Sequence, residues 1–103
     1  MDDKFILEDG DPVPCNDLLT WGKWMETGER RIARTQIDDV SVSTVFLGLD
    51  HSFGGSTPIL FETMVFGGPL DQEQERYATR KEAQAGHDKM VERVKEAACT
   101  PTP

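Results

Sequence analysis

Residues 40–49, VSVSTVFLGL, are the stretch that decides the fold. β-Branched and aromatic side chains dominate it, which is typical of a β-strand. Residues 59–66, ILFETMVF, repeat this composition after a loop rich in glycine and serine. Both segments carry apolar residues at both alternating sets of positions, whereas a strand with one solvated face alternates apolar and polar residues. The pattern therefore predicts two central antiparallel strands covered on both faces, either by helices or by a second copy in a homodimer.

Weaker strand signals lie on either side of this pair. Residues 30–37 alternate polar and apolar side chains and end at an Asp38-Asp39 turn. Residues 4–7 form a short apolar segment that ends at an Asp-Gly turn. Residues 76–78 fit either a short edge strand or a lead-in to the next helix. We expect residues 30–37 to join the two central strands in an antiparallel meander.

Two helices complete the pattern. Two prolines, Pro12 and Pro14, predict an extended connection, and Asn16 or Asp17 then caps a helix that runs to about residue 27. Its apolar stripe consists of Leu18, Trp21 and Met25. A second amphipathic helix follows a capping box and runs to about residue 98. The predicted order is β-α-β-β-β-α, an α+β fold with an antiparallel sheet of three to four strands.

The length of 103 residues fits a single domain over residues 1–99, with residues 100–103 as a disordered tail. No apolar run approaches the ~20 residues needed to span a bilayer, and the acidic N-terminus is unlike a secretory signal. We therefore expect a cytoplasmic protein that makes no contact with membranes. Its two cysteines, Cys15 and Cys99, lie far apart in the sequence and are expected to stay reduced.

The net charge of −8 is the most unusual bulk property. It opposes binding to nucleic acid, because phosphates repel a negative surface. It serves either solubility alone or recognition of a partner protein with a basic surface. The residues predicted to contact such a partner are Asp9, Asp11, Asp38, Asp39, Phe53 and Trp24.

Four residues are weak candidates for catalysis or metal binding, namely Asp50, His51, Glu62 and His87. A buried carboxylate beside an imidazole acts as a general base, and both groups are also metal ligands. Their spacing matches no metal motif, however, and structural roles are favoured, with His87 as a hydrogen-bonded core histidine and Glu62 at an edge or paired with an arginine. The sequence therefore predicts no cofactor, no metal and no catalytic residue with a recognised signature.

The helix–meander–helix order resembles the double-stranded-RNA-binding domain, but in topology only, since that domain docks on phosphates through basic loops. A closer resemblance rests on residues 42–51, 60–68 and 76–79, with Trp24 and residues 30–33, 82–83 and 86–87. In these segments the chain resembles a family of small uncharacterised proteins from bacteriophages and bacterial mobile elements. The resemblance covers about residues 20 to 90 and implies a phage or prophage context without implying an activity.

Three hypotheses follow from the sequence. The first is a non-enzymatic phage protein that binds a basic host protein and inhibits a defence or nucleic-acid enzyme by mimicking the charge of DNA, as an anti-CRISPR protein does. The second is a small metal-dependent or acid/base enzyme that uses the four candidate residues. The third is an oligomeric accessory protein whose interface is the second face of the sheet.

Overall fold

The computed structural model describes residues 3–52 and 55–99. Its elements are β1 (Phe5–Glu8), β2 (Asp11–Pro14), α1 (Leu18–Thr27), β3 (Arg31–Ile37), β4 (Val40–Phe46), β5 (Phe61–Phe66), β6 (Gln74–Tyr77) and α2 (Arg80–Cys99). The predicted α+β fold is confirmed. The predicted tail at residues 100–103 lies outside the described residues.

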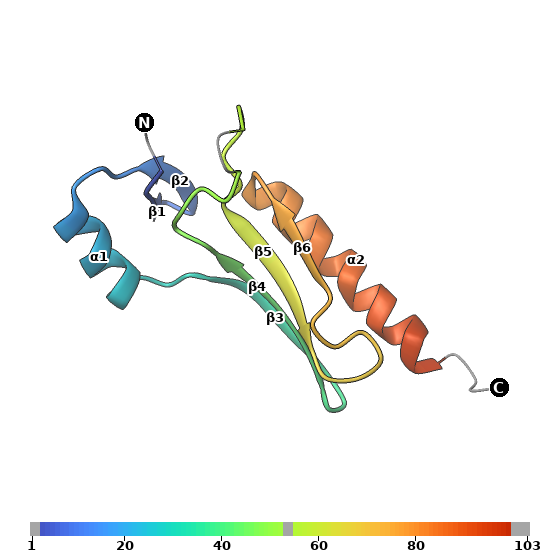
Figure 1. Ribbon diagram of the computed structural model, residues 1–103. Helices are drawn as coiled ribbons and strands as arrows, with labels where there is room; N and C mark the ends of the chain where they lie inside the picture. Colours follow the sequence, from blue (N-terminus) through green and yellow to red (C-terminus); the bar gives the residue numbers. More distant parts are fainter. Residues whose placement is uncertain (1–2, 53–54, 100–103) are drawn as a thin grey trace.

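The main sheet has the order β3-β4-β5-β6, and every neighbouring pair is antiparallel. Helix α2 runs along one face of this sheet and contacts all four strands (Figure 1). Residues 40–46 alternate between buried and partly buried along β4, so this strand turns one set of side chains toward α2. The predicted meander is therefore present, and the first two residues of the candidate edge strand at 76–78 are the end of β6, which stops at Tyr77.

The core lies between α2 and the sheet and consists of two clusters of buried residues. One cluster contains Val42, Val65, Met90 and Val94 near the C-terminal end of α2. The other is built around Phe46 and Phe61, whose ring centroids lie 5.5 Å apart. Burying the larger apolar side chains contributes about 1.5–3 kcal/mol each, so this layer dominates the stability of the fold.

The N-terminal segment differs from the prediction, because it forms a two-stranded ribbon of its own. Strand β1 pairs with β2 through a two-residue turn. Both turn residues have a positive φ, 52° at Asp9 and 85° at Gly10, which is the pattern of a type I′ hairpin turn. Strand β2 contains Pro12 and Pro14, which the sequence led us to read as a plain connection. Proline is tolerated in an edge strand, where a missing N–H costs no ladder bond, and β2 has only one neighbour.

The ribbon joins the main sheet where β4 ends. Gly48 has a φ of 78°, a conformation that favours glycine, and its carbonyl accepts the Phe5 N–H at 2.9 Å. Strand β4 accordingly stops at Phe46 rather than at Leu49, the end that the sequence predicted. Leu49 instead forms a β-bridge with Lys4. Apolar residues at 47, 49, 59 and 60 thus lie beyond the strand ends and do not cover the second face of the sheet.

Both predicted helix caps are present. Asp17 caps α1 through the Leu19 N–H at 3.2 Å. Thr79 and Glu82 form the reciprocal capping box of α2, with both backbone N–H groups bonded at 3.1 Å. No helix in the described part of the chain is long and apolar enough to cross a membrane.

Candidate functional site

His87 lies on the buried side of α2, with 3% of its surface exposed. Its Nε2 is 2.9 Å from the Thr35 hydroxyl and its Nδ1 is 2.7 Å from the Thr44 hydroxyl. Thr44 in turn bonds to the Thr63 hydroxyl at 2.5 Å. Burial lowers the pKa of His87, so the ring is neutral, with one nitrogen as donor and the other as acceptor. This chain of hydroxyls and imidazole lies within the core and ties α2 to β3, β4 and β5.

Glu62 lies on the opposite face of the sheet from His87. Its neighbour Thr63 points into the core, and successive side chains of a strand point to opposite faces. The Glu62 carboxylate forms an ion pair with Arg76 Nε at 2.9 Å, across the register pair of β5 and β6. The sheet therefore separates this carboxylate from the imidazole, and the two do not share a site.

Asp50 and His51 lie in the loop that follows β4. The Asp50 carboxylate accepts hydrogen bonds from the N–H groups of Ile59 and Ser52, at 3.0 and 2.8 Å. These bonds, with one from the Ser52 hydroxyl, hold the pKa of Asp50 below its usual value. His51 Nδ1 donates to the Leu49 carbonyl at 2.8 Å. Both side chains thus fasten the two ends of this loop.

The four candidate catalytic residues are therefore not brought together. Two of them fasten a loop, one forms an ion pair on the open face of the sheet, and one bonds hydroxyls in the core. Within residues 3–52 and 55–99, no group of three or more His, Cys, Asp or Glu side chains is arranged to hold a metal ion.

The acidic residues gather at the N-terminal end of the described chain. We call residues 3–29, which form the β1–β2 ribbon and α1, the N-terminal unit. It carries seven carboxylates against two lysines, a net charge of −5 in 27 residues. The other described residues carry eleven carboxylates against nine basic side chains, a net charge of only −2. The acidity of this protein is therefore largely a property of one unit.

Helix α1 is attached to the rest of the molecule by one side only. Trp21 Nε1 donates to the Gly48 carbonyl at 3.0 Å, and Trp24 packs edge-to-face on Phe46, with centroids 5.6 Å apart. No residue of α1 is buried. The helix projects away from the main sheet (Figure 1). Trp24 is thus half-buried against the core and not an open surface anchor.

Two leucines at the start of α1 are largely exposed, in contrast to the predicted stripe. Leu18 has 62% of its surface exposed and Leu19 has 84%. The helix faces the core through Trp21, Trp24 and Met25, and Leu18 lies one turn before the region where the helix meets the sheet. A leucine at a helix start is compatible with either a buried or an exposed position, so the exposure of these two side chains could not be predicted from the sequence.

The remaining candidates for partner contact fall into two groups. Asp9 and Asp11 lie at the turn of the ribbon, within the N-terminal unit. Asp38 and Asp39 form the turn between β3 and β4, at the opposite end of β4 from the ribbon. Strand β4, seven residues or roughly 23 Å long, lies between the Asp38–Asp39 turn and the end of the sheet at which the ribbon joins. Phe53 lies outside the described residues.

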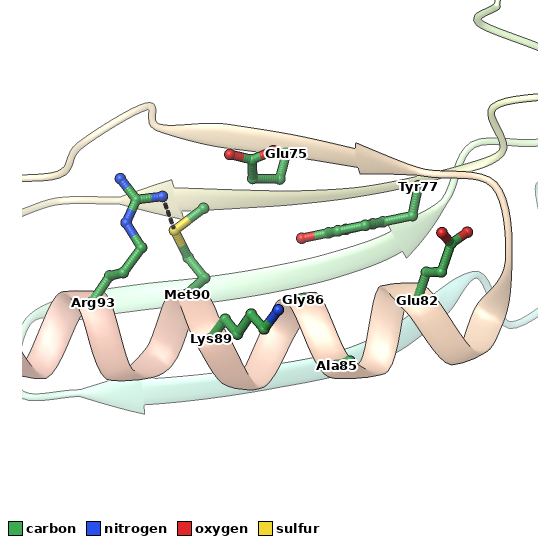
Figure 2. A pocket seen from close by; sticks show the side chains of 8 residues that line it. All are labelled: Glu75, Tyr77, Glu82, Ala85, Gly86, Lys89, Met90 and Arg93. Carbon is green, nitrogen blue, oxygen red and sulfur yellow. Dashed lines mark hydrogen bonds between the residues drawn. The ribbon is translucent and has the colours of Figure 1, made fainter.

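A groove of about 410 Å³ opens between β6 and α2 (Figure 2). The Tyr77 ring lies across Gly86, and a side chain at position 86 would collide with it. The Tyr77 hydroxyl is buried without a hydrogen bond of standard geometry among the described residues. Burial raises its pKa, while the nearby Thr63 hydroxyl, which is bonded to Thr44, opposes this shift. Figure 2 shows Glu75, Glu82, Lys89 and Arg93 around the groove, so its rim is electrically neutral.

Comparisons of this chain with protein-family models, with curated proteins and with solved structures find no match.

Proposed function

We propose that this chain is a non-enzymatic binding protein whose N-terminal unit docks on a basic surface of another protein. The observation that carries the proposal is the charge of −5 in residues 3–29, next to the exposed Leu18 and Leu19. A small apolar patch within a charged rim is the usual composition of a docking surface. Carboxylates around it select a partner of opposite charge and speed its approach.

The class of partner follows from the same charges. Clefts of high positive potential are common on proteins that bind DNA or RNA, because they must attract phosphates. A partner held by the N-terminal unit through such a cleft is no longer free to bind nucleic acid. In the phage context that the sequence resemblance implies, this partner is a host nucleic-acid enzyme, including a nuclease of a defence system.

Capture from host lysate on the immobilised protein, with and without excess double-stranded DNA, tests this proposal. We expect the retained proteins to be nucleic-acid-binding proteins that DNA displaces. The variant Glu8→Lys/Asp11→Lys is expected to lose the retained proteins, because it reverses two charges of the N-terminal unit.

A matched control shows whether the loss of binding depends on where the charge is changed or only on the change in net charge. The variant Asp39→Lys/Glu92→Lys makes the same change in net charge, but outside the N-terminal unit, and is expected to retain the partner. Equal retention by both variants, or retention that DNA does not affect, would contradict the proposal. The double variant Leu18→Ser/Leu19→Ser tests the apolar part, since both side chains are exposed and folding does not require them.

A further inference from the structure

The face of the main sheet opposite α2 is open. Helix α2 covers the other face, and the main contacts of α1 are with β1 rather than with β3 to β6. The strand registers place three arginines, Arg31, Arg34 and Arg76, on this open face, together with a single carboxylate, Glu62. Two larger apolar side chains lie among them, the partly buried Met64 and the half-exposed Phe66. We call this surface the open face.

The open face is basic in a protein that is otherwise acidic. Glu62 is paired with Arg76, but no carboxylate of the described residues forms an ion pair with the side chains of Arg31 and Arg34. The chain has 19 carboxylates and 11 lysines and arginines, so internal partners are not scarce. Two exposed guanidinium groups without an ion-pair partner among the described residues are available for an external carboxylate.

Arg34 is already held in place over the sheet. Its Nε donates to the Ser41 hydroxyl at 3.1 Å, and its Nη2 donates to Gln36 Oε1 at 3.4 Å. Ser41 is the register partner of Phe66, so the guanidinium is fixed on the row that carries the exposed ring. A guanidinium held by such bonds loses less conformational entropy when it binds a carboxylate.

The best complement to the open face on this molecule is its own N-terminal unit. That unit has an excess of carboxylates around Leu18 and Leu19, while the open face has an excess of arginines around Met64 and Phe66. Within one copy the unit is held at the end of β4, through the bond between Trp21 and Gly48 and the packing of Trp24 on Phe46. The end of α1 and Glu29 adjoin one corner of the open face in the same copy, where the Glu29 carboxylate accepts the Arg31 N–H at 3.0 Å. Because the ribbon and the start of α1 are held at the end of β4, their contact with the open face requires another copy.

We propose that the open face of one copy binds the N-terminal unit of a second copy, in a head-to-tail contact. A two-fold contact between two open faces is disfavoured, because it would bring the arginines of both copies together. The open face measures roughly 23 by 19 Å, or roughly 440 Å², from the strand dimensions. That is about half of the 800 Å² per partner in a standard interface, so the contact is weak and forms at high protein concentration.

This contact makes a distinctive prediction about assembly. Two different surfaces meet, so each added copy leaves one acidic unit and one open face free. In light scattering at low salt, the average mass is therefore expected to rise with concentration beyond twice the monomer mass of 11.5 kDa. Near 1 M salt, where the Debye length is about 3 Å, we expect the association to be at least tenfold weaker.

Two variants and their mixture test the pairing of the surfaces. Arg31→Glu/Arg34→Glu disables the open face, and Glu8→Lys/Asp11→Lys disables the N-terminal unit, so each variant alone is expected to stay monomeric. An equal mixture of Arg31→Gln/Arg34→Gln with Glu8→Lys/Asp11→Lys retains one intact copy of each surface. It is expected to form a heterodimer and nothing larger, because the two altered surfaces do not carry opposite charges. The neutral variant Arg31→Gln/Arg34→Gln tests the same face without new carboxylates, and circular dichroism verifies that each variant is folded.

Three results would overturn the inference. They are a wild-type protein that stays monomeric at millimolar concentration, a mass that stops at the dimer, and a mixture of variants that remains monomeric. Binding of single-stranded RNA that requires Arg31 and Arg34, without self-association, would instead assign the open face to phosphates. These measurements use the purified chain alone, so they succeed or fail independently of the proposed basic partner.

Discussion

His87 shows how a single residue that suggests chemistry serves the core instead. Its two ring nitrogens are both occupied by threonine hydroxyls, and only 3% of its surface is exposed. A buried polar network that is fully bonded fixes the packing of the elements that contribute to it. The imidazole therefore sets how α2 lies on β3 and β4, and it has no free nitrogen to offer a substrate.

The lowered pKa of His87 predicts that the stability of the fold depends on pH. The pKa of an unfolded histidine is near 6.5, and burial lowers the pKa in the folded state. As the pH falls below about 6.5, the unfolded chain binds a proton that the folded chain does not, so the free energy of unfolding decreases. Urea unfolding between about pH 7.5 and 5.5 measures this loss.

Two variants assign the pH dependence to one imidazole. His87→Gln is expected to be less stable at neutral pH, because it replaces a bonded ring in the core, but to show a flatter profile over this range. His51→Gln, in the loop after β4, removes the other histidine of the chain and is the matched control. The assignment to His87 is wrong if wild type and His87→Gln lose stability equally as the pH falls.

At the scale of elements, the two helices differ in how tightly they are held, and their internal glycines report this difference. Gly22 of α1 has nothing within 4 Å of the position that a Cβ would take, whereas Gly86 of α2 is covered by the Tyr77 ring. Glycine within a helix costs about 1 kcal/mol relative to alanine when nothing else intervenes. The same substitution is therefore expected to have opposite effects in the two helices.

Gly22→Ala is expected to stabilise α1 by about 0.5–1 kcal/mol, because only the helix propensity changes. Gly86→Ala is expected to destabilise the fold by about 1–3 kcal/mol, because the new methyl group displaces the Tyr77 ring. Thermal and urea unfolding of both variants measure the two signs. A stabilising Gly86→Ala would show that the ring is not held against the helix.

Local sequence signals predicted the elements well where one residue decides the conformation. The capping residues Asp17 and Thr79 and the turn at Asp9 are such cases, because a side-chain bond or a positive φ acts over a few residues. Signals that depend on tertiary context failed. Strand β2 was missed because prolines fit an edge strand, and the sequence does not show that β2 has a neighbour on one side only. Leu18 was expected inside because an amphipathic helix pattern does not show which turn of the helix meets the sheet.

The same distinction between local signals and tertiary context applies to the candidate site. Period-two alternation along β5 suffices to put Glu62 and Thr63 on opposite faces, so that part was predictable from the strand. The face that α2 covers is not encoded in that alternation, and it decides that Glu62 is outside and His87 inside. The acidic unit was only partly predictable. Asp9 and Asp11 were identified from charge, but their distance from Asp38 and Asp39 depends on the ribbon joining the far end of β4.

At the scale of the whole molecule, charge is unevenly divided along an elongated body. The molecule measures 54 by 28 by 19 Å, with the N-terminal unit at one end and the β3–β4 turn at the other (Figure 1). The unit is acidic, the open face is basic, and α2 is nearly neutral. A uniform negative charge would serve solubility alone, whereas a divided one gives each surface its own class of partner.

Titration of the ¹⁵N-labelled protein with a lysine-rich peptide, followed by NMR, tests whether the negative charge is concentrated in the N-terminal unit. We expect the largest amide shifts to cluster in the N-terminal unit, around Glu8, Asp11 and the start of α1, and we expect high salt to abolish them. Small shifts spread over all acidic positions, or the largest shifts at Asp38 and Asp39, would contradict it.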